Sequence, residues 1–247
     1  MQMSSLYTSM SGLEDVNAQL QAVASNIANA NTPGYAAMQA VAEAAPYEGA
    51  NAPPGGAVVA AVPGPDLTQG RMNQTGDTLD VGLSGDSWLT VQTAGGTALT
   101  RDGALSISNA GILTDSAGNP VLSTTGSPIS LPQLTSLKIG EDGTISGVVA
   151  GSSSGLSQQF GQIAMVSTPG GTLTPMGNSL YLPPTGAALT PAANGALHQG
   201  YLNDSNVDPT AAMMQMISDS RSYELQAQLT KSQTSASADL NSLLAQG

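Results

Sequence analysis

The side chains able to do chemistry in this 247-residue chain are few and widely separated. The chain has one histidine, His198, and no cysteine. A Ser-His-Asp hydrolase needs a histidine between its nucleophile and its acid, so such a triad would have to use His198. Serine and aspartate are so common in this sequence that a partner at a chance position proves nothing. We therefore assign no catalytic residue.

Metal and cofactor sites find no better support. A structural zinc site takes several Cys or His ligands, and a calcium loop needs closely spaced acidic side chains. The sequence contains neither pattern, and Asp115 to Asn119 is predicted to be a turn. It also contains no Gly-rich loop with a lysine that could bind phosphate groups. The expected protein has no metal, no cofactor and no enzymatic activity.

The charge balance excludes two classes of partner. There are 17 acidic and 5 basic residues, the net charge is −12, and the first basic residue is Arg71. Nucleic acid and anionic membrane surfaces both need clustered Lys or Arg, so we expect neither as a partner. No segment reaches the roughly 20 apolar residues of a membrane span, and the N-terminus lacks the pattern of a signal peptide. The sequence predicts a cytoplasmic protein or one exported without a cleaved signal.

The N-terminal region predicts a long helix with one apolar stripe. One set of positions seven apart is Met3, Met10, Asn17 and Ala24, and the set three residues later is Leu6, Leu13, Leu20 and Ile27. This heptad pattern is typical of a coiled-coil seam, where a polar residue such as Asn17 can set the register. An amphipathic helix packed on its own domain explains the pattern equally well. Thr32, Pro33 and Gly34 should end the helix near Ala30.

A second long helix is predicted from Asp208 to Ala245. Asp208 is a good N-cap and Pro209 suits the first helical position. Its first half has an apolar face, formed by Met213, Met216, Ile217 and Tyr223. Its middle is weaker, with Thr230, Thr234 and Ser237 where a strong seam would have leucine, so the isolated helix should be marginal. Arg221 and Glu224 lie three residues apart and predict a local ion pair, with a contact between subunits as the alternative.

The region between the helices reads as β-rich. Short apolar stretches at 88–92, 104–108 and 137–139 each precede a turn signal, and Asp102-Gly103 and Asp142-Gly143 are expected to form hairpin turns. The spacing favours an antiparallel barrel or sandwich with Trp88 in its core. Residues 51–65 should be extended, and 151–155 should form a flexible surface loop. The predicted fold class is α+β: residues 1–35 and 205–247 form a coiled-coil-like assembly domain of terminal helices, 36–80 an extended connector, and 81–204 a β-rich outer domain.

Three motifs, in the right order along the chain, resemble the flagellar axial family of rod, hook and hook-associated proteins. The N-terminal motif runs from Ala24 to Tyr35 and ends in Asn-Thr-Pro-Gly-Tyr. The central motif comprises Gly85 to Val91, Leu99 to Gly103 and Gly111 to Leu113, and the C-terminal one runs from Ser205 to Glu224. The chain departs from the family at two points: it has one asparagine after Ser25 where two are frequent, and Ala36 where a basic residue is common. Within the family, its length and the segments 63–68 and 77–81 most resemble the proximal rod member.

The resemblance implies a structural subunit that polymerises through its terminal helices and transmits torque from motor to hook. It implies other rod subunits, proximal and distal, and the flagellar type III export apparatus as partners, and the periplasmic rod of the basal body as location. The distal rod protein is the alternative within the family; a β-rich adhesin or phage-tail-like binding module is the alternative outside it. The expected assembly interface combines the helical stripes and the terminal motifs: Leu6, Met10, Leu13, Asn17, Leu20, Ile27, Asn29, Asn31, Thr32, Pro33, Gly34, Tyr35, Ser205, Asn206, Val207, Met213, Met216, Ile217, Arg221, Tyr223 and Glu224.

Overall fold

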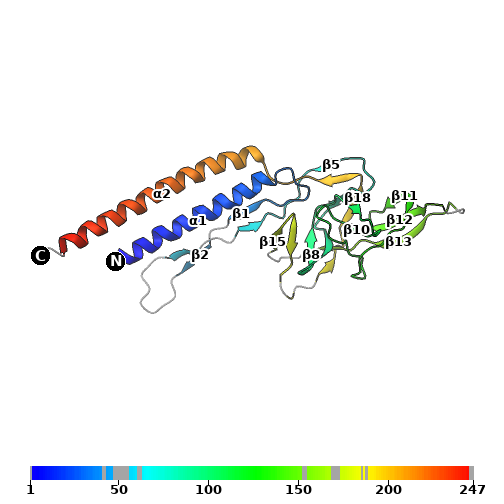
Figure 1. Cartoon of the computed structure of the whole chain (residues 1–247), viewed down its shortest axis with the longest axis horizontal. Helices are drawn as coiled ribbons and strands as arrows, with labels where there is room; N and C mark the ends of the chain where they lie inside the picture. The colour runs from blue at the N-terminus through cyan, green and yellow to red at the C-terminus, as the bar shows by residue number, and fades with distance from the viewer. Residues whose placement is uncertain are drawn as a thin grey trace. The chain divides into compact units, whose positions relative to one another are not determined.

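The computed structural model describes residues 2–40, 43–46, 56–59, 63–151, 155–167, 173–184, 186 and 189–244. The chain divides into two compact units. The first, which we call the helical unit, comprises residues 1–28, 38–66 and 208–247; the second, the β unit, comprises 29–37 and 67–207. The protein is therefore α+β, with a helix near each end of the chain and a β-rich middle, as the sequence predicts (Figure 1).

Two long antiparallel helices, α1 (Gln2–Ala28) and α2 (Pro209–Leu244), form the frame of the helical unit (Figure 1). Helix α1 ends two residues before the predicted Ala30, because Asn29 already starts a turn in which the Thr32 N–H donates to its carbonyl over 3.1 Å. Helix α2 begins as predicted. The carboxylate Oδ1 of Asp208 accepts from the N–H groups of Thr210 at 2.9 Å and Ala211 at 3.1 Å, the bonding of an N-cap.

Two antiparallel strand pairs complete the helical unit. Strand β1 (Met38–Ala40) pairs with β4 (Pro63–Pro65), and β2 (Glu43–Pro46) pairs with β3 (Gly56–Val59). β1 packs along α1, where the side-chain amide of Asn26 accepts from the N–H of Met38 and donates to the carbonyl of the same residue. The segment predicted as an extended connector, 36–80, thus contains these four strands and β5 (Met72–Gln74). Part of the predicted extended stretch, 51–55 and 60–62, lies outside the described residues.

The β unit consists of one larger sheet and several small ones. The larger sheet has six strands in the order β15-β16-β8-β7-β14-β17, with bounds Thr174–Gly177, Leu180–Leu182, Gly96–Thr100, Trp88–Thr93, Met165–Ser167 and Thr190–Pro191. A three-stranded sheet has the order β11-β12-β13, with bounds Leu134–Ile139, Thr144–Val149 and Gln158–Gln162. Three strand pairs remain: β18 (Ala196–Gln199) with β6 (Val81–Ser84), β19 (Tyr201–Asn203) with β5, and β10 (Leu113–Thr114) with β9 (Ser106–Ile107). None of these sheets closes into a barrel in the described part of the chain.

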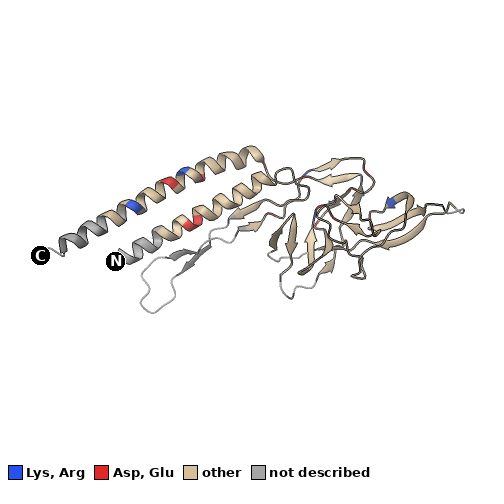
Figure 2. Cartoon of the chain, in the orientation of Figure 1, with Lys and Arg blue, Asp and Glu red and all other residues tan. Residues whose placement is uncertain are grey.

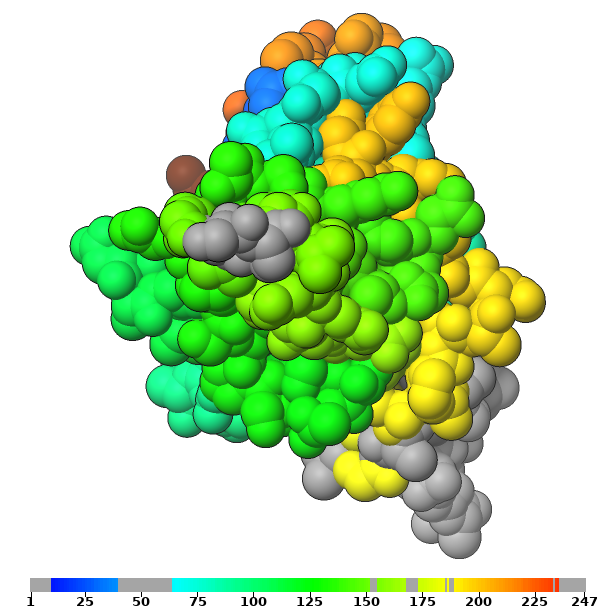
Figure 3. Space-filling view, turned by 90° about the vertical axis from the view of Figure 1, so that its right-hand side faces the viewer, coloured from blue at the N-terminus to red at the C-terminus, as the bar shows by residue number. Residues whose placement is uncertain are grey.

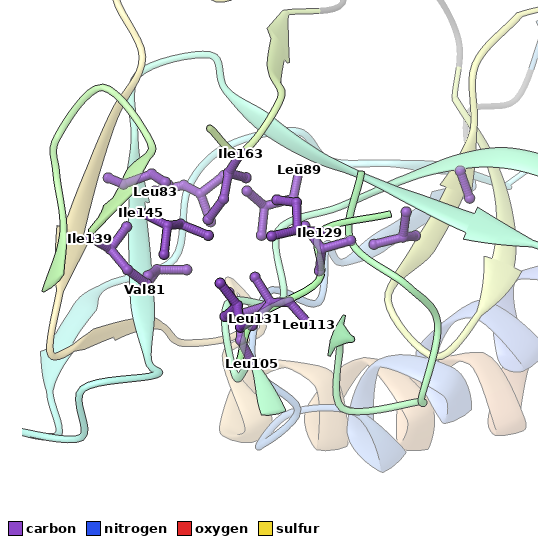
Figure 4. Close-up of a cluster of buried hydrophobic side chains, with 14 of the residues drawn as sticks. Val81, Leu83, Leu89, Leu105, Leu113, Ile129, Leu131, Ile139, Ile145 and Ile163 are labelled. Carbon is purple, nitrogen blue, oxygen red and sulfur yellow. The ribbon is translucent and has the colours of Figure 1, made fainter. Parts of the chain in front are cut away.

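Aliphatic side chains from several of these sheets meet in one core. Figure 4 shows Val81 and Leu83 of β6 facing Ile139, Ile145 and Ile163, with Leu89, Leu113 and Ile129 beside them. A second, smaller cluster surrounds Trp88, whose side chain is fully buried, as predicted. Viewed from the end shown in Figure 3, the surface is formed largely by the green part of the chain, which contains β11 to β13. These cores hold the β unit together without any disulfide, because the chain has no cysteine.

One predicted hairpin is confirmed and one is wrong. Asp142 and Gly143 form the turn between β11 and β12: Gly143 has a φ of 83°, and Asp142 accepts from the N–H of Thr144 at 3.0 Å. Asp102 and Gly103 follow β8 but make no hairpin. Asp102 is buried, and the Val81 N–H donates to the Gly103 carbonyl over 2.9 Å, so this dipeptide lies against β6 instead. The predicted turn at Asp115 to Asn119 is present, with the Asp115 N–H donating to the Asn119 carbonyl at 2.9 Å.

Candidate assembly interface

Residues from the two terminal motifs lie side by side in the β unit. We call residues 29–37 the strap and residues 201–207 the return segment. The Gly34 N–H donates to the Asn203 carbonyl at 2.8 Å, and the Asn206 N–H donates to the Tyr35 carbonyl at 3.4 Å. The Ala37 N–H donates to the Asn206 side-chain Oδ1 at 2.6 Å. The motifs at opposite ends of the sequence are therefore parts of one bonded structure.

Gly34 is where the strap passes closest to the sheet. Its φ of +66° lies in the left-handed region, which a side chain disfavours. A Cβ at this position would also collide with backbone atoms of Arg101 and Asp102. Glycine is thus required here both for its conformation and for the close approach. The next two residues, Tyr35 and Ala36, are buried against the β unit.

The strap packs on strand β16 and on the turn that precedes it. The Tyr181 hydroxyl accepts a hydrogen bond from the Ala36 N–H at 2.9 Å, and the Ser179 hydroxyl donates to the Pro33 carbonyl at 3.2 Å. Burial raises the pKa of Tyr181 to about 12, so its hydroxyl stays neutral. Ser179 has a φ of 55°, a strained conformation for a residue with a side chain, and it follows Asn178 with a φ of 51°. The strained turn places the two hydroxyl groups beneath the strap.

Arg101 contacts the aromatic side chains of the larger sheet. Its guanidinium lies 4.1 Å from the ring centroid of Trp88, and Trp88 in turn meets Tyr181 edge to face at 5.4 Å. Its Nη1 donates to the Leu67 carbonyl at 2.5 Å, and Nη2 lies 3.6 Å from the carboxylate of Asp86. Burial lowers the pKa of Arg101 from its ordinary value, while Asp86 opposes that shift. Arginine titrates so high that the group stays charged, and the stacked cation orders Trp88 and Tyr181.

Three asparagine amides join segments that are distant in sequence. In the β unit, Asn203 accepts from the Leu83 N–H at 2.6 Å and donates to the Leu83 carbonyl at 3.0 Å. Asn206 accepts from Ala37 and donates to the Thr68 carbonyl at 3.0 Å. In the helical unit, Asn26 accepts from the Met38 N–H at 2.7 Å and donates to its carbonyl at 2.9 Å. Each amide bonds backbone groups as a neighbouring strand would.

The faces by which α1 and α2 meet are polar and small. Gly12 lies against the side chain of Gln226, so the helices approach closely there. Seven residues earlier on α2, Asp219 is only 5% exposed. Its Oδ1 accepts from the Gln215 amide at 2.8 Å, while its Oδ2 has no hydrogen-bond partner among the described residues. An interface of this kind gains little from apolar burial.

The most exposed apolar side chains of α2 lie on the opposite face. We call this set the outward face of α2; its apolar members are between 54% and 63% exposed, namely Met213, Met214, Ile217, Leu225 and Leu229. A surface helix in water normally buries such a stripe. Exposed apolar groups in this number indicate a surface that another protein covers.

The predicted stripe of α1 is not fully buried within the chain. Met10 and Asn17 are exposed, while Leu13, Leu20 and Ile27 are half-buried. Leu6 lies in α1, but its side chain is outside the described residues. The residues that α1 buries are Ala22 and Asn26, from the neighbouring stripe. The heptad pattern is thus present, but its residues are not the ones that α1 buries most deeply within the chain.

The remaining predicted residues divide between the two units. Asn29, Thr32, Pro33, Gly34 and Tyr35 lie in the strap with the exposed Asn31, and Ser205, Asn206 and Val207 lie in the return segment. On α2, Met213, Met216, Ile217 and Tyr223 are all exposed. The local ion pair predicted between Arg221 and Glu224 is not formed in the part of the chain that the structure describes, because an exposed pair gains too little to order two long side chains. Sequence reasoning missed Asn203, Tyr181 and Arg101, whose roles depend on contacts far away in the chain.

The described residues contain no arrangement suited to catalysis. A groove of about 660 Å³ in the β unit is lined by Ile107, Leu131, Leu137 and their neighbours in the chain, and no titratable side chain lines it. His198 packs its ring against Tyr201 at 6.4 Å between centroids. No group of three or more metal-ligating side chains, and no helix long and apolar enough to cross a membrane, occurs among the described residues.

Comparison with known proteins agrees with this geometry. The family model described as flagella basal body rod protein matches residues 6–35, the flagellar hook protein FlgE/F/G D1 domain matches 82–147, and the flagellar basal body rod FlgEFG protein C-terminal matches 198–243. The flagellar basal-body rod protein FlgF of Escherichia coli is 34% identical, with 97% of each chain covered. The chain belongs to the flagellar basal-body rod protein family.

Other members of the rod protein family are also similar over most of their length. FlgF of Salmonella typhimurium is 32% identical with 97% of each chain covered, and FlgG of Bacillus subtilis is 30% identical with 89% and 91% covered. The rod family is structural, so the prediction that this chain is not an enzyme is confirmed by its relatives. The N-terminal family model covers α1 from Leu6 and the strap to Tyr35, and the C-terminal one covers the return segment and α2 to Leu243. The family's two terminal matches therefore include the residues that bond to each other in the β unit.

Proposed function

We propose that this rod protein is a subunit of the proximal rod and that it polymerises through the outward faces of its terminal helices. The observation that carries the proposal is the distribution of apolar side chains in the helical unit. Met214, Ile217 and Leu225 are exposed, while the polar Asp219 is buried. A helix pair with its apolar side chains outside is incomplete in water and becomes stable when neighbours cover them.

The β unit serves as the outer domain in this proposal. The strap follows α1 in the chain and the return segment precedes α2, and within the β unit the two segments bond to each other through Gly34, Tyr35 and Asn206. Together, the helices and the terminal motifs form the assembly domain.

Two finer statements also belong to the proposal. Export through the flagellar type III apparatus, without a cleaved signal, and assembly in the periplasm both follow from membership of the rod family as the resemblance implies them. Identity with FlgF relatives of 34% and 32% over nearly the whole chain supports the proximal rod over the distal one, although FlgG relatives are similar as well.

The test is deletion of the gene followed by electron microscopy of isolated basal bodies. We expect truncated rods without hooks, restored by the full chain but not by residues 36–204 alone. A Leu13→Asp and Leu20→Asp double variant should keep a folded β unit, seen as unchanged Trp88 fluorescence, yet fail to enter the rod. Normal rods and swimming in the deletion strain would contradict the proposal, and normal incorporation of the double variant would contradict its helical part.

A further inference from the structure

Each terminal helix carries a charge on its outward face. Helix α1 contains Glu14 and Asp15 and no Lys or Arg, whereas α2 contains the exposed cations Arg221 and Lys231 together with the acids Asp219 and Glu224 (Figure 2). Arg221 stands in the middle of the outward face of α2. At about 100° per residue it lies within about 40° of Met214, Ile217 and Leu225, and about 160° from the buried Asp219. The positive charge of Arg221 is thus surrounded by exposed apolar side chains.

Arg221 has no ion-pair partner among the described residues. The ion pair that occurs among the described residues joins Arg101 and Asp86 in the β unit. Glu224, the nearest acid in sequence on that side, is exposed and does not reach it. A cation in an apolar surface that will be covered needs a carboxylate from whatever covers it, because burying it alone is costly.

The outward face of α1 offers that carboxylate. Glu14 is exposed and lies about 200° around the helix from Gly12, which faces α2. It directly follows Leu13 and lies beside the exposed Met10 and Asn17. In heptad terms Glu14 flanks the apolar stripe, where charged residues select the partner helix in coiled coils. Within one chain Glu14 and Arg221 point away from each other, so they can pair only between copies.

The two charges are also at similar heights along the helices. The contact of Gly12 with Gln226 places antiparallel residues 17 and 221 at the same level. Glu14 is three residues from that level, about 4.5 Å at the rise of an α-helix. A second copy rotated about an axis parallel to the helices would present its α1 antiparallel to α2 of the first, with these side chains within one helical turn of each other.

We propose that the outward face of α2 binds the outward face of α1 of a second copy of this chain, with Arg221 paired to Glu14. The inference rests on the proposed function and specifies its contact. Such a contact joins different surfaces on the two copies, so it repeats from copy to copy instead of closing as a dimer. The apolar side chains around Arg221 are covered by the exposed side chains that surround Glu14 on α1 of the neighbour, including Met10.

Cysteine cross-linking tests the pairing directly, because the chain has no native cysteine. Glu14→Cys and Arg221→Cys would be carried on separate copies, expressed together in the deletion strain, and oxidised in isolated basal bodies. We expect a disulfide-linked dimer of this chain from the mixture and none from Arg221→Cys alone. Lys231→Cys with Glu14→Cys is the matched control: Lys231 is exposed on the same helix, ten residues or about 15 Å along the axis from Arg221, and should give no dimer.

Charge reversal provides the second test. Arg221→Glu and Glu14→Arg alone should each reduce the swimming fraction by roughly tenfold or more, and the double variant should restore it. Lys138→Glu, an exposed change in the β unit, should have no effect. Cross-links only to a different protein, no cross-link in assembled rods, or no recovery in the double variant would overturn the inference while the deletion phenotype still supports the proposed function. A deletion strain with normal rods would overturn the proposed function itself.

Discussion

At the scale of single residues, side-chain amides take the place of backbone in this protein. A side-chain amide has a donor and an acceptor in one plane, as a peptide group does, and can therefore bond both groups of one residue. Asn203 does this at Leu83 and Asn26 at Met38. The β-strands here are short, so such amides supply bonds that a longer ladder would otherwise provide.

Replacing Asn203 with Asp tests this role. The change keeps an acceptor for the Leu83 N–H but puts a carboxylate beside the Leu83 carbonyl in a buried position. We expect the free energy of unfolding of the β unit to fall by about 2–3 kcal/mol, since a buried group loses its partner and a charge is added. Urea unfolding followed by the fluorescence of Trp88 measures it. Asn109→Asp, at an exposed turn, is the control, and an equal loss in both variants would contradict the argument.

Asp102 should give the β unit a pH dependence of stability. Burial raises the pKa of Asp102 above its ordinary value, against the hydrogen bonds from Ser116 and the Ala104 N–H, and the nearby Asp115 and Asp80 raise it further. Between the unfolded and the folded pKa the folded state binds more protons, so the free energy of unfolding rises as the pH falls through that window. The gain disappears as the pH rises above the folded pKa.

An Asp102→Asn variant removes the titrating group and keeps an acceptor for Ala104. Its unfolding free energy, measured in urea from about pH 7 to about pH 4, should therefore lack the part of the slope that the native chain shows. Asn109→Ala, which removes no titrating group and lies at an exposed position, should leave the slope of the native chain unchanged. Identical slopes for Asp102→Asn and the native chain would show that Asp102 titrates as it does in the unfolded state.

At the scale of elements, α1 and α2 approach each other closely at Gly12. A Cβ there would meet the end of the Gln226 side chain, which is flexible and can move. Gly12→Ala should therefore be accommodated and, because alanine favours helix by about 1 kcal/mol over glycine, should increase helicity. Gly12→Leu is too large for the contact and should separate the helices. Circular dichroism at 222 nm and hydrogen exchange of the α1 amides would distinguish the two; equal behaviour of both variants would argue against close packing at this point.

Sequence alone predicts the elements that local signals determine. Asp208 and Pro209 locate the start of α2 because an N-cap acts within three residues, and Asp142-Gly143 marks a hairpin for a similar reason. The heptad pattern also predicts the apolar stripe of α1, but it does not identify the surface that covers this stripe. Gly12 makes the contact with α2, whereas Asn26 bonds to Met38 of β1. Neither residue type signals burial in the sequence. The hairpin predicted at Asp102-Gly103 is wrong because a long-range contact with β6 overrides the turn preference of this dipeptide.

At the scale of the whole molecule, the two units differ in what stabilises them. The β unit has an aliphatic core in which Val81, Leu83 and Leu89 are fully buried, while the helical unit has a polar contact at Asp219 and exposed apolar side chains. Apolar burial is the main source of stability in folded domains. The isolated subunit should therefore not unfold as one cooperative system.

Two probes can follow the units separately in the full-length chain. Far-ultraviolet circular dichroism at 222 nm reports mainly α1 and α2, and fluorescence reports Trp88, the single tryptophan, which lies in the β unit. We expect the helical signal to be lost at lower urea than the fluorescence signal. Gly34→Val should then move only the fluorescence transition to lower urea, because the strap belongs to the β unit and a side chain at Gly34 collides with Arg101 and Asp102. Coincident transitions in the native chain, or an equal shift of both in the variant, would mean that the helices and the β unit unfold together and that the outward apolar face is not the weak point of the free subunit.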